Sequence, residues 1–203
     1  GTDELDLFYV HWPNPFVSQR RLMQSIRPLL RAGTVRRVGV SNYSLGQWLD
    51  AERALGAPVT ANQVPFNLLR PGPANDLVPH ASAIGRLVVA YSPLGQGLLA
   101  GSTTSDSPGG MRAVSRRFRE VTRGVATSLI DVLHDVATAH GATQAQVALA
   151  WVIRHPNTVA IPGARTLAQL EENAAAADLE LSDDEFNALT AEAVAMPAGR
   201  ARH

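Results

Sequence analysis

Polar side chains stand at the ends of four apolar stretches that have the composition of buried strands. They are His11, Ser41 with Asn42, Gln63 with Asn67, and Tyr91 with Ser92. The carboxyl ends of parallel strands form the ligand-binding edge of α/β proteins, so we expect these side chains to lie together. The amides of Asn42 and Gln63 each offer a donor and an acceptor to an amide-bearing ligand, and Tyr91 offers a ring for stacking. Each residue also has a structural interpretation: His11 as a strand cap, Ser41-Asn42 as a helix start, and Tyr91 as core.

A second group of residues that suits a ligand follows the last predicted strand. Residues 161–166 form a turn that contains glycine and Arg165 and leads into a predicted helix. An arginine beside a helix N-terminus makes an anion site. Gln169 has the spacing of a capping box with Thr166, so a structural role is the alternative for Gln169. Glu172 and Asn173 are equally compatible with a solvated helix face.

Three other motifs fail on spacing. Gly95-Gln96-Gly97 follows a strand, but the next glycine, Gly101, is one position late for a dinucleotide-binding fingerprint, and no helical sequence follows. Residues 39–43 end in tyrosine where the nucleophile elbow of a hydrolase needs glycine. His134 and His140 point to different sides of one predicted helix, so the sequence predicts no metal site.

Short apolar runs alternate with segments of helical periodicity along the whole chain. This alternation requires parallel strands joined by crossover helices, and a doubly wound sheet and a barrel both satisfy it. The predicted strands cover residues 5–12, 35–42, 59–66, 87–91 and 159–161. The predicted helices cover residues 17–32, 45–55, 74–84, 128–140, 143–155, 167–177 and 186–194.

Two segments lack such periodicity. Residues 97–124 combine glycine, serine and threonine with five arginines, a composition typical of a long functional loop. Residues 196–203 are expected to form a flexible tail. No linker divides the rest of the chain, so we predict a single domain over residues 1–203. The sequence has neither the pattern of a signal peptide nor an apolar run long enough to span a membrane.

The composition excludes several classes of function. The chain has 18 acidic side chains and 18 basic ones, all arginine, and it contains no cysteine. Balanced charge argues against nucleic-acid and anionic-membrane partners. A chain without cysteine fits a reducing cytoplasm, which is the location we expect. The lack of lysine excludes Schiff-base chemistry and any lysine that lowers the pKa of a neighbouring group.

Taken in order, six segments resemble motifs of the aldo-keto reductase family. They are residues 5–13 (LDLFYVHWP), 33–43 (GTVRRVGVSNY), 62–67 (NQVPFN), 90–95 (AYSPLG), 146–151 (QVALAW) and 161–165 (IPGAR), the last followed by Glu172-Asn173. The resemblance implies an α/β fold, the (β/α)8 TIM barrel, represented here by roughly its C-terminal five βα units. It also implies reversible hydride transfer between a nicotinamide and the carbonyl of an aldehyde or ketone.

The resemblance assigns roles to individual residues. His11 matches the catalytic histidine that donates a hydrogen bond to the substrate carbonyl. Ser41, Asn42 and Gln63 would bind the carboxamide of NADP(H), and Tyr91 would stack on the nicotinamide ring. The residues implied around the cofactor phosphates and adenosine are Ser92, Leu94, Gly97, Gly163, Ala164, Arg165, Gln169, Glu172 and Asn173. Residues 97–124 match a long loop of the family that folds over the cofactor. NADP(H) is the expected cofactor, with NAD(H) as the alternative because Arg165 is a single cation.

The sequence also departs from the family. The resemblance implies that three strands preceding the first matched one carry the catalytic aspartate, tyrosine and lysine, and these strands have no counterpart here. We therefore expect the chain alone to be inactive and poorly stable. A further N-terminal segment, a second chain or self-association would close the barrel. The alternative function is a catalytically inactive nucleotide-binding or regulatory subunit, similar to the potassium-channel β subunits of the family.

Overall fold

The computed structural model describes residues 2–101 and 126–195. Within them the chain divides into two compact units. Unit 1 comprises Gly1–Pro65, Gly72–Tyr91 and His155–Ile161, and unit 2 comprises Phe66–Pro71, Ser92–Arg154 and Pro162–His203. No helix among the described residues is both long and apolar enough to cross a membrane.

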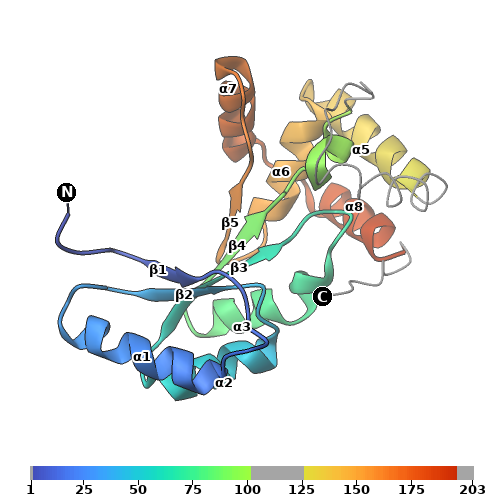
Figure 1. Ribbon diagram of the computed structural model, residues 1–203. Coiled ribbons are helices and arrows are strands. Elements are labelled where there is room, and N and C mark those ends of the chain that lie inside the picture. Colours follow the sequence, from blue (N-terminus) through green and yellow to red (C-terminus); the bar gives the residue numbers. More distant parts are fainter. Residues whose placement is uncertain (1, 102–125, 196–203) are drawn as a thin grey trace. The chain divides into compact units, whose positions relative to one another are not determined.

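Unit 1 is built on a five-stranded parallel sheet (Figure 1). Its strands are β1 (Phe8–Val10), β2 (Val38–Ser41), β3 (Val59–Pro65), β4 (Leu87–Tyr91) and β5 (Thr158–Ile161). They lie side by side in their order along the chain, β1-β2-β3-β4-β5, and every neighbouring pair is parallel. A doubly wound sheet reverses its strand order at a switch point, whereas a barrel does not. The sheet is therefore of the barrel kind, which decides between the two architectures left open by periodicity.

Helices α1 (Gln19–Arg31), α2 (Leu45–Leu55) and α3 (Leu77–Ala83) lie on one side of this sheet (Figure 1). Their inward side chains, among them Met23, Ile26 and Trp48, are buried. The indole Nε1 of Trp48 donates to the Val59 carbonyl at 3.2 Å, which ties α2 to β3. The helices begin and end where the sequence provides caps: Ser44 and Gln47 form a capping box, and Gly56 ends α2 at φ +67°.

The opposite face of the sheet carries apolar side chains that remain accessible. Leu87, Val159 and Ile161 are each 37–46% exposed. Gly39 lies on this face, where the ring of Tyr9 from β1 covers it: a Cβ built on Gly39 would sit 2.6 Å from Tyr9 Cε1. Glycine is thus required at position 39 by the close approach of an aromatic ring.

Unit 2 is helical in its described part. It contains the 3₁₀ segments η2 (Gly95–Ala100) and η3 (Ala176–Asp178) and the helices α5 (Ala126–His140), α6 (Gln144–Ile153), α7 (Leu167–Ala175) and α8 (Asp183–Ala195). Leu129, Leu133, Leu189 and Trp151 are fully buried where α5, α6 and α8 pack together. Phe66 also belongs to this core, with its ring centroid 5.4 Å from that of Trp151.

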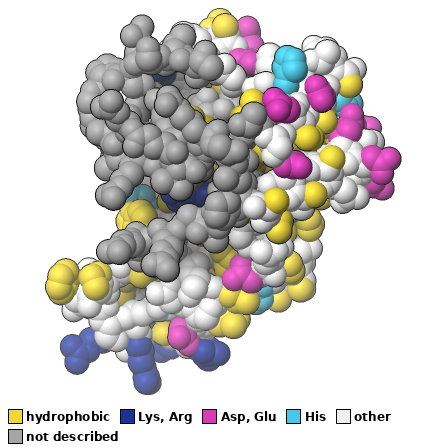
Figure 2. All heavy atoms as spheres, turned by 90° about the vertical axis from the view of Figure 1, so that its right-hand side faces the viewer, with side chains coloured by type: hydrophobic (Ala, Val, Ile, Leu, Met, Phe, Trp, Pro, Cys, Tyr) yellow, Lys and Arg dark blue, Asp and Glu magenta, His cyan; other side chains and the backbone are white. Residues whose placement is uncertain are grey.

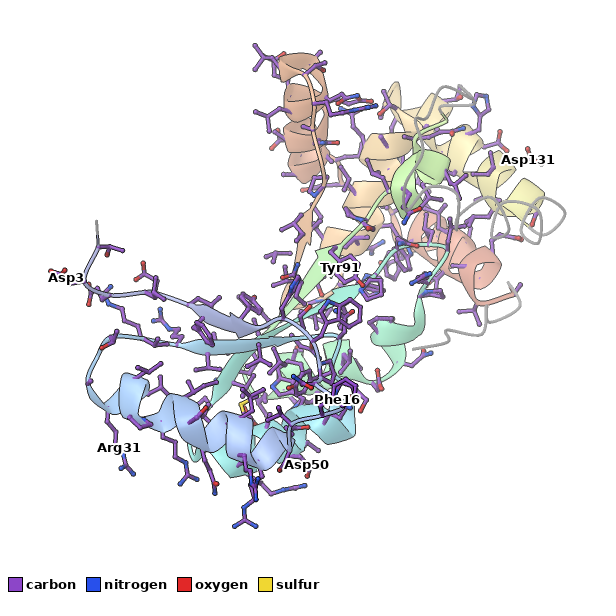
Figure 3. All side chains as sticks on the ribbon, in the orientation of Figure 1. Asp3, Phe16, Arg31, Asp50, Tyr91 and Asp131 are labelled. Atoms are coloured by element: carbon purple, nitrogen blue, oxygen red, sulfur yellow. The ribbon has the colours of Figure 1, made fainter. Side chains whose placement is uncertain are left out.

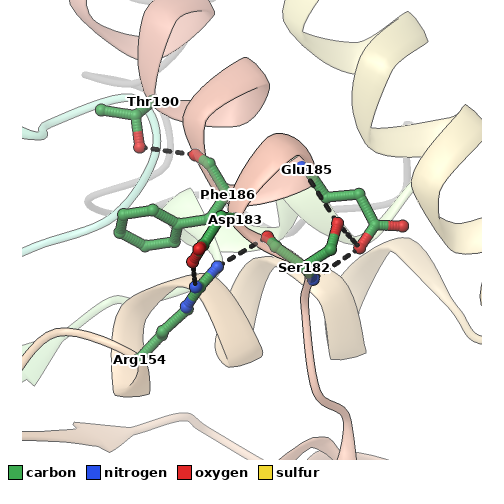
Figure 4. Close-up of polar contacts among 6 residues, drawn as sticks. All are labelled: Arg154, Ser182, Asp183, Glu185, Phe186 and Thr190. Carbon is green, nitrogen blue, oxygen red and sulfur yellow. Dashed lines mark hydrogen bonds and ion pairs between the residues drawn. The ribbon is translucent and has the colours of Figure 1, made fainter.

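Arg154 joins the end of α6 to the start of α8 (Figure 4). Its Nη1 donates to the Ser182 carbonyl at 2.6 Å, its other terminal nitrogen pairs with Asp183, and its guanidinium lies 4.6 Å from the centre of the Phe186 ring. Two hydrogen bonds from Ser182 hold the pKa of Glu185 below its ordinary value. One arginine thus joins the two helices through a hydrogen bond, an ion pair and a cation–π contact.

The predicted elements agree with the observed ones, with differences at their ends. The first strand covers only Phe8–Val10 instead of residues 5–12, and Leu5 forms an isolated bridge with Val35. The helix predicted from residue 74 begins at Leu77, because Gly72–Asn75 forms a 3₁₀ turn and the Asp76 side chain caps Leu77. Of the predicted loop over residues 97–124, the first residues lie in η2. Residues 102–124 and the predicted tail, residues 196–203, lie outside the described part.

Candidate functional site

The carboxyl ends of β2, β3 and β4 bring four of the predicted site residues together in unit 1. Ser41 and Asn42 end β2, Gln63 lies opposite Ser41 in β3, and Tyr91 ends β4 (Figure 3 labels Tyr91). The parallel register is the cause, because it aligns the same end of each strand at one edge. The prediction that the polar strand ends share one edge is confirmed for these residues.

A hydrogen-bond network fixes the orientation of Asn42. The Tyr91 hydroxyl donates to Asn42 Oδ1 at 2.9 Å, and Asn42 Nδ2 donates to Ser41 Oγ at 3.0 Å. The Ser41 hydroxyl and the Asn42 backbone N–H both donate to the Gln63 carbonyl at 2.9 Å. Two strands therefore clamp the Asn42 amide, which leaves one N–H and one lone pair of that amide for a ligand.

Ser41 and Gln63 differ in their access to a ligand. Ser41 is 1% exposed, and its hydroxyl already donates and accepts within the network. The Gln63 side chain is half-buried and makes no hydrogen bond with any residue that the structure describes. Gln63 thus offers a free amide at the strand edge, whereas Ser41 holds Asn42 in place.

The backbone bends sharply at this edge. Asn42 has φ +62°, a left-handed conformation that asparagine tolerates better than most residues. Asn62, fully buried in β3, donates from Nδ2 to the Tyr43 carbonyl at 2.8 Å and so holds the residue that follows the bend. Left-handed residues cluster at functional turns, which is consistent with a binding role for the Asn42 bend.

His11 follows β1 at the same edge of the sheet and is exposed. Its ring centroid lies 6.4 Å from that of Trp12, which is 56% exposed, and Phe16 in the same connection is 94% exposed (Figure 3). The β1–α1 connection therefore presents a histidine and two accessible aromatic rings. An exposed imidazole can donate a hydrogen bond to a ligand oxygen.

Tyr9 and Tyr43 of unit 1 are poorly suited to donate a proton. Burial raises the pKa of both Tyr9 and Tyr43 above the ordinary value of a phenol. A higher pKa makes a phenol a weaker acid near neutral pH, so neither side chain suits proton donation. The absence of lysine from the chain is consistent with this, since no ammonium group can offset the effect of burial.

In unit 2, the segment that follows β4 folds into a tight turn. Ser92 has φ +49°, and Gly95, Gln96 and Gly97 follow at φ +56°, +60° and +93°. The buried Asn67 holds this turn: its Nδ2 donates to the Ser92 carbonyl at 2.8 Å. Ser92, Leu94 and Gly97 are all half-buried on this turn. The glycines serve a turn here and not the start of a dinucleotide-binding helix, as their spacing predicts.

The second predicted group surrounds the N-terminus of α7, also in unit 2. Gly163, Ala164, Arg165 and Gln169 are exposed. Thr166 caps the helix, Gln169 Oε1 accepts from the Arg165 backbone N–H at 2.8 Å, and Asn173 Nδ2 donates to the Gly163 carbonyl at 3.4 Å. Glu172, which precedes Asn173 in the sequence, is half-buried. The guanidinium of Arg165 forms no ion pair with any described residue, so the cation is accessible to an anionic ligand at a helix N-terminus.

Two buried asparagines were not assigned a role by sequence reasoning. Asn62 was read only as part of a motif and Asn67 only as a polar strand end, yet each holds the bend that carries a candidate residue. Asparagine inside an otherwise apolar strand is a signal for such a role, because a buried amide needs hydrogen-bond partners.

Comparison with known proteins identifies the family of the chain. The aldo/keto reductase family model matches residues 1–193. An uncharacterised oxidoreductase of Mycobacterium tuberculosis is 46% identical over 93% of this chain and 58% of its own length. Methylglyoxal reductase YeaE of Escherichia coli is 33% identical over 98% of this chain and 62% of its own. A solved aldo/keto reductase from Klebsiella pneumoniae, in complex with NADP and acetate, has a TM-score of 0.66 at 30% identity and covers 93% of this chain and 58% of its own.

The chain belongs to the aldo/keto reductase family. Its sequential parallel sheet represents five βα units of the (β/α)8 barrel. The chain spans about three fifths of the length of the relatives that it matches.

Proposed function

We propose that the chain forms most of the cofactor site of an NADP(H)-dependent carbonyl reductase, in which residues outside this sequence complete the active site. The observation that carries the proposal is the network of Ser41, Asn42, Gln63 and Tyr91 at the strand edge. It presents an oriented amide, a free amide and an aromatic side chain, which match the carboxamide and the flat ring of a nicotinamide.

The phosphate and adenosine end of the cofactor fits the residues of unit 2. The turn through Ser92, Leu94 and Gly97 contains several residues with positive φ, and turns of this kind can form anion-binding concavities that suit the diphosphate. Arg165 at the N-terminus of α7 offers a guanidinium that forms no ion pair with a described residue and so suits a ribose 2′-phosphate, with Gly163, Ala164, Gln169, Glu172 and Asn173 around the adenosine. The cation supports a preference for NADP(H) over NAD(H).

His11 would act directly on the substrate. Its imidazole donates a hydrogen bond to the carbonyl oxygen of an aldehyde or ketone, which polarises the carbonyl carbon. The bound nicotinamide supplies the hydride. The proton for the alkoxide comes from a group outside this sequence, since burial raises the pKa of Tyr9 and Tyr43 and Tyr91 already donates to Asn42.

Fluorescence titration of the full chain with NADPH and NADH tests the cofactor assignment. We expect Arg165→Gln to weaken NADPH binding on the order of tenfold and to leave NADH binding unchanged, because only NADPH carries the 2′-phosphate. Arg37→Gln removes an equal charge elsewhere and serves as the control. Equal affinity of the unmodified chain for both cofactors would overturn the preference for NADP(H).

A non-catalytic regulatory subunit is the second candidate function. The favouring observation is that Ser41, Asn42, Gln63 and Tyr91 form one hydrogen-bond network, whereas His11 is the only family catalytic residue that the sequence matches. Turnover of 4-nitrobenzaldehyde with NADPH separates the two functions. Binding of NADPH without turnover by the full-length gene product would favour the regulatory subunit.

A further inference from the structure

Two open pockets lie along α1 and α2 in unit 1, with volumes of about 520 Å³ and about 240 Å³, and Arg27 lines both. We call the surface that they line together the arginine groove. It is lined by Ser18, Gln19, Arg20, Gln24, Arg27, Leu30, Arg31, Asp50, Arg53, Ala54, Leu55, Gly56 and Ala57.

The charges of the arginine groove are only partly satisfied. Arg27 donates to the Leu55 carbonyl at 2.8 Å, and Arg53 pairs with Asp50 on the same helix. Arg20 and Arg31 are exposed and form no ion pair with any residue that the structure describes. Arg31 projects away from the strands (Figure 3), and dark-blue side chains gather along the lower edge of the molecule (Figure 2). The groove therefore has a net positive charge and free guanidinium groups.

The chain has no net charge, but its basic and acidic residues are concentrated in different stretches of the sequence. Residues 7–49 contain six arginines and no acidic residue, whereas residues 166–195 contain eight acidic residues and no basic one. Within the acidic stretch, Asp178, Glu180 and Asp184 are exposed and form no ion pair with any described residue. We call these three residues the acidic strip. Each copy of the chain thus carries both a cationic groove and an anionic strip.

The lining of the groove indicates which anion it suits. None of the described lining residues is aromatic, and single-stranded nucleic acids are held by aromatic stacking together with cations. The smaller pocket adds apolar surface from the half-buried Leu30 and Ala57 beside the arginines. Arginine forks match carboxylates in bidentate pairs, and Leu179 lies between Asp178 and Glu180 in the acidic strip. A protein segment with alternating carboxylates and leucine is the matching partner.

We propose that the arginine groove binds the acidic strip of a second copy of the chain. The contact joins two different surfaces, so it is heterologous and each copy can engage two neighbours. Because the paired groups are exposed, the association weakens as salt shortens the range of the electrostatic attraction. This contact is independent of the proposed cofactor site, whose residues it does not use.

Sedimentation velocity of the full chain over a range of concentrations, at 50 mM and 500 mM NaCl, tests the contact. We expect concentration-dependent association that is at least tenfold weaker at the higher salt. Arg20→Gln with Arg31→Gln should weaken the low-salt association by a similar factor. Arg21→Gln with Arg37→Gln removes the same charge from exposed residues outside the groove and should leave the association unchanged.

A charge-swap experiment identifies the two surfaces directly. Arg20→Glu with Arg31→Glu makes the groove acidic, and Asp178→Arg with Glu180→Arg makes the strip basic. At low salt each variant alone should associate no more strongly than the unmodified chain does at 500 mM NaCl, and an equimolar mixture should again associate more strongly. A chain that is monomeric at low salt, an association indifferent to salt and to the groove variant, or a mixture that stays dissociated would each overturn the proposal.

Discussion

Asn42 shows how a single residue combines backbone and side-chain requirements at the candidate site. Its left-handed backbone turns the chain at the end of β2, and its amide is held between the Tyr91 hydroxyl and Ser41. The resemblance to the family gives Tyr91 a stacking role, and the hydrogen bond adds a second role through its hydroxyl. A mutation can separate the contribution of the Tyr91 ring from that of its hydroxyl.

Tyr91→Phe keeps the ring and removes the donor to Asn42. We expect NADPH affinity to fall about fivefold, because the net contribution of such a hydrogen bond is about 1 kcal/mol. Fluorescence titration measures the affinity, and thermal unfolding should change little. Tyr9→Phe removes a hydroxyl from the neighbouring region of the sheet and should leave NADPH binding unchanged. An unchanged affinity of Tyr91→Phe would show that the hydroxyl does not orient Asn42 for the cofactor.

Gly39 is a single residue at which the Tyr9 ring leaves no room for a side chain. Gly39→Ala places a methyl group 2.6 Å from the Tyr9 ring, so we expect destabilisation of about 1–3 kcal/mol in urea unfolding. Gly46→Ala is the matched control, because nothing lies within 4 Å of its Cβ. In helix α2 this change should stabilise the protein by about 0.5–1 kcal/mol. The loss of stability caused by Gly39→Ala should be smaller in a protein that already carries Tyr9→Ala.

At the scale of elements, helices begin and end at local signals, and long-range contacts join them. Ser44, Thr143 and Ser182 cap their helices through the residue three positions later. The capping pattern is readable in the sequence, so the positions of α2 and α6 were predicted closely. Arg154 carries no such local signal, because its partners are 28 and 29 residues away.

Arg154→Ala removes the joint between α6 and α8. We expect it to lower the free energy of unfolding by about 1–3 kcal/mol, since a half-buried charge-assisted hydrogen bond, an ion pair and a cation–π contact are lost together. Urea denaturation measures the loss. Arg53→Ala removes a more exposed ion pair within one helix and should change stability by less than about 0.5 kcal/mol. Equal effects of the two substitutions would contradict this role of Arg154.

Local patterns in the sequence predict elements, whereas the arrangement of those elements depends on contacts between distant residues. Alternating elements indicate parallel strands, but a barrel and a doubly wound sheet share that alternation, and only the order β1-β2-β3-β4-β5 separates them. The strand ends that carry Asn42, Gln63 and Tyr91 were predicted because apolar runs stop there. The burial of Ser41 and the hydrogen bonds of Asn62 and Asn67 depend on strand register and on turns, which residue spacing does not specify.

On the scale of the whole molecule, the described sheet has two edges and one apolar face that remain exposed. β1 pairs only with β2, β5 pairs only with β4, and Leu87, Val159 and Ile161 are accessible between them. Unpaired strand edges and apolar faces of this kind promote association unless another segment covers them. The proposed cover is the remainder of a barrel, supplied by additional residues or by a second chain.

The polypeptide of residues 1–203, expressed alone, should therefore bind a hydrophobic dye and aggregate on warming. High salt should not dissolve these aggregates, because the apolar contacts are not screened. Val159→Thr with Ile161→Thr should reduce both dye binding and aggregation, whereas Leu167→Thr on the exposed side of α7 should not reduce dye binding to the same extent. A soluble monomer with a single cooperative unfolding transition would contradict the prediction.

The strand order also has a consequence for the course of folding. β1, β2 and β3 are each joined to the next strand by a shorter connection, whereas residues 92–157 separate β4 from β5. Loop closure becomes less favourable as the closed segment lengthens, so the earlier pairs can form while the chain between β4 and β5 is still uncollapsed. β5 then adds to a sheet that already exists, and as an edge strand it can separate from β4 without breaking the other strand pairs. Its amide hydrogens should exchange with solvent before those of β3, the central strand.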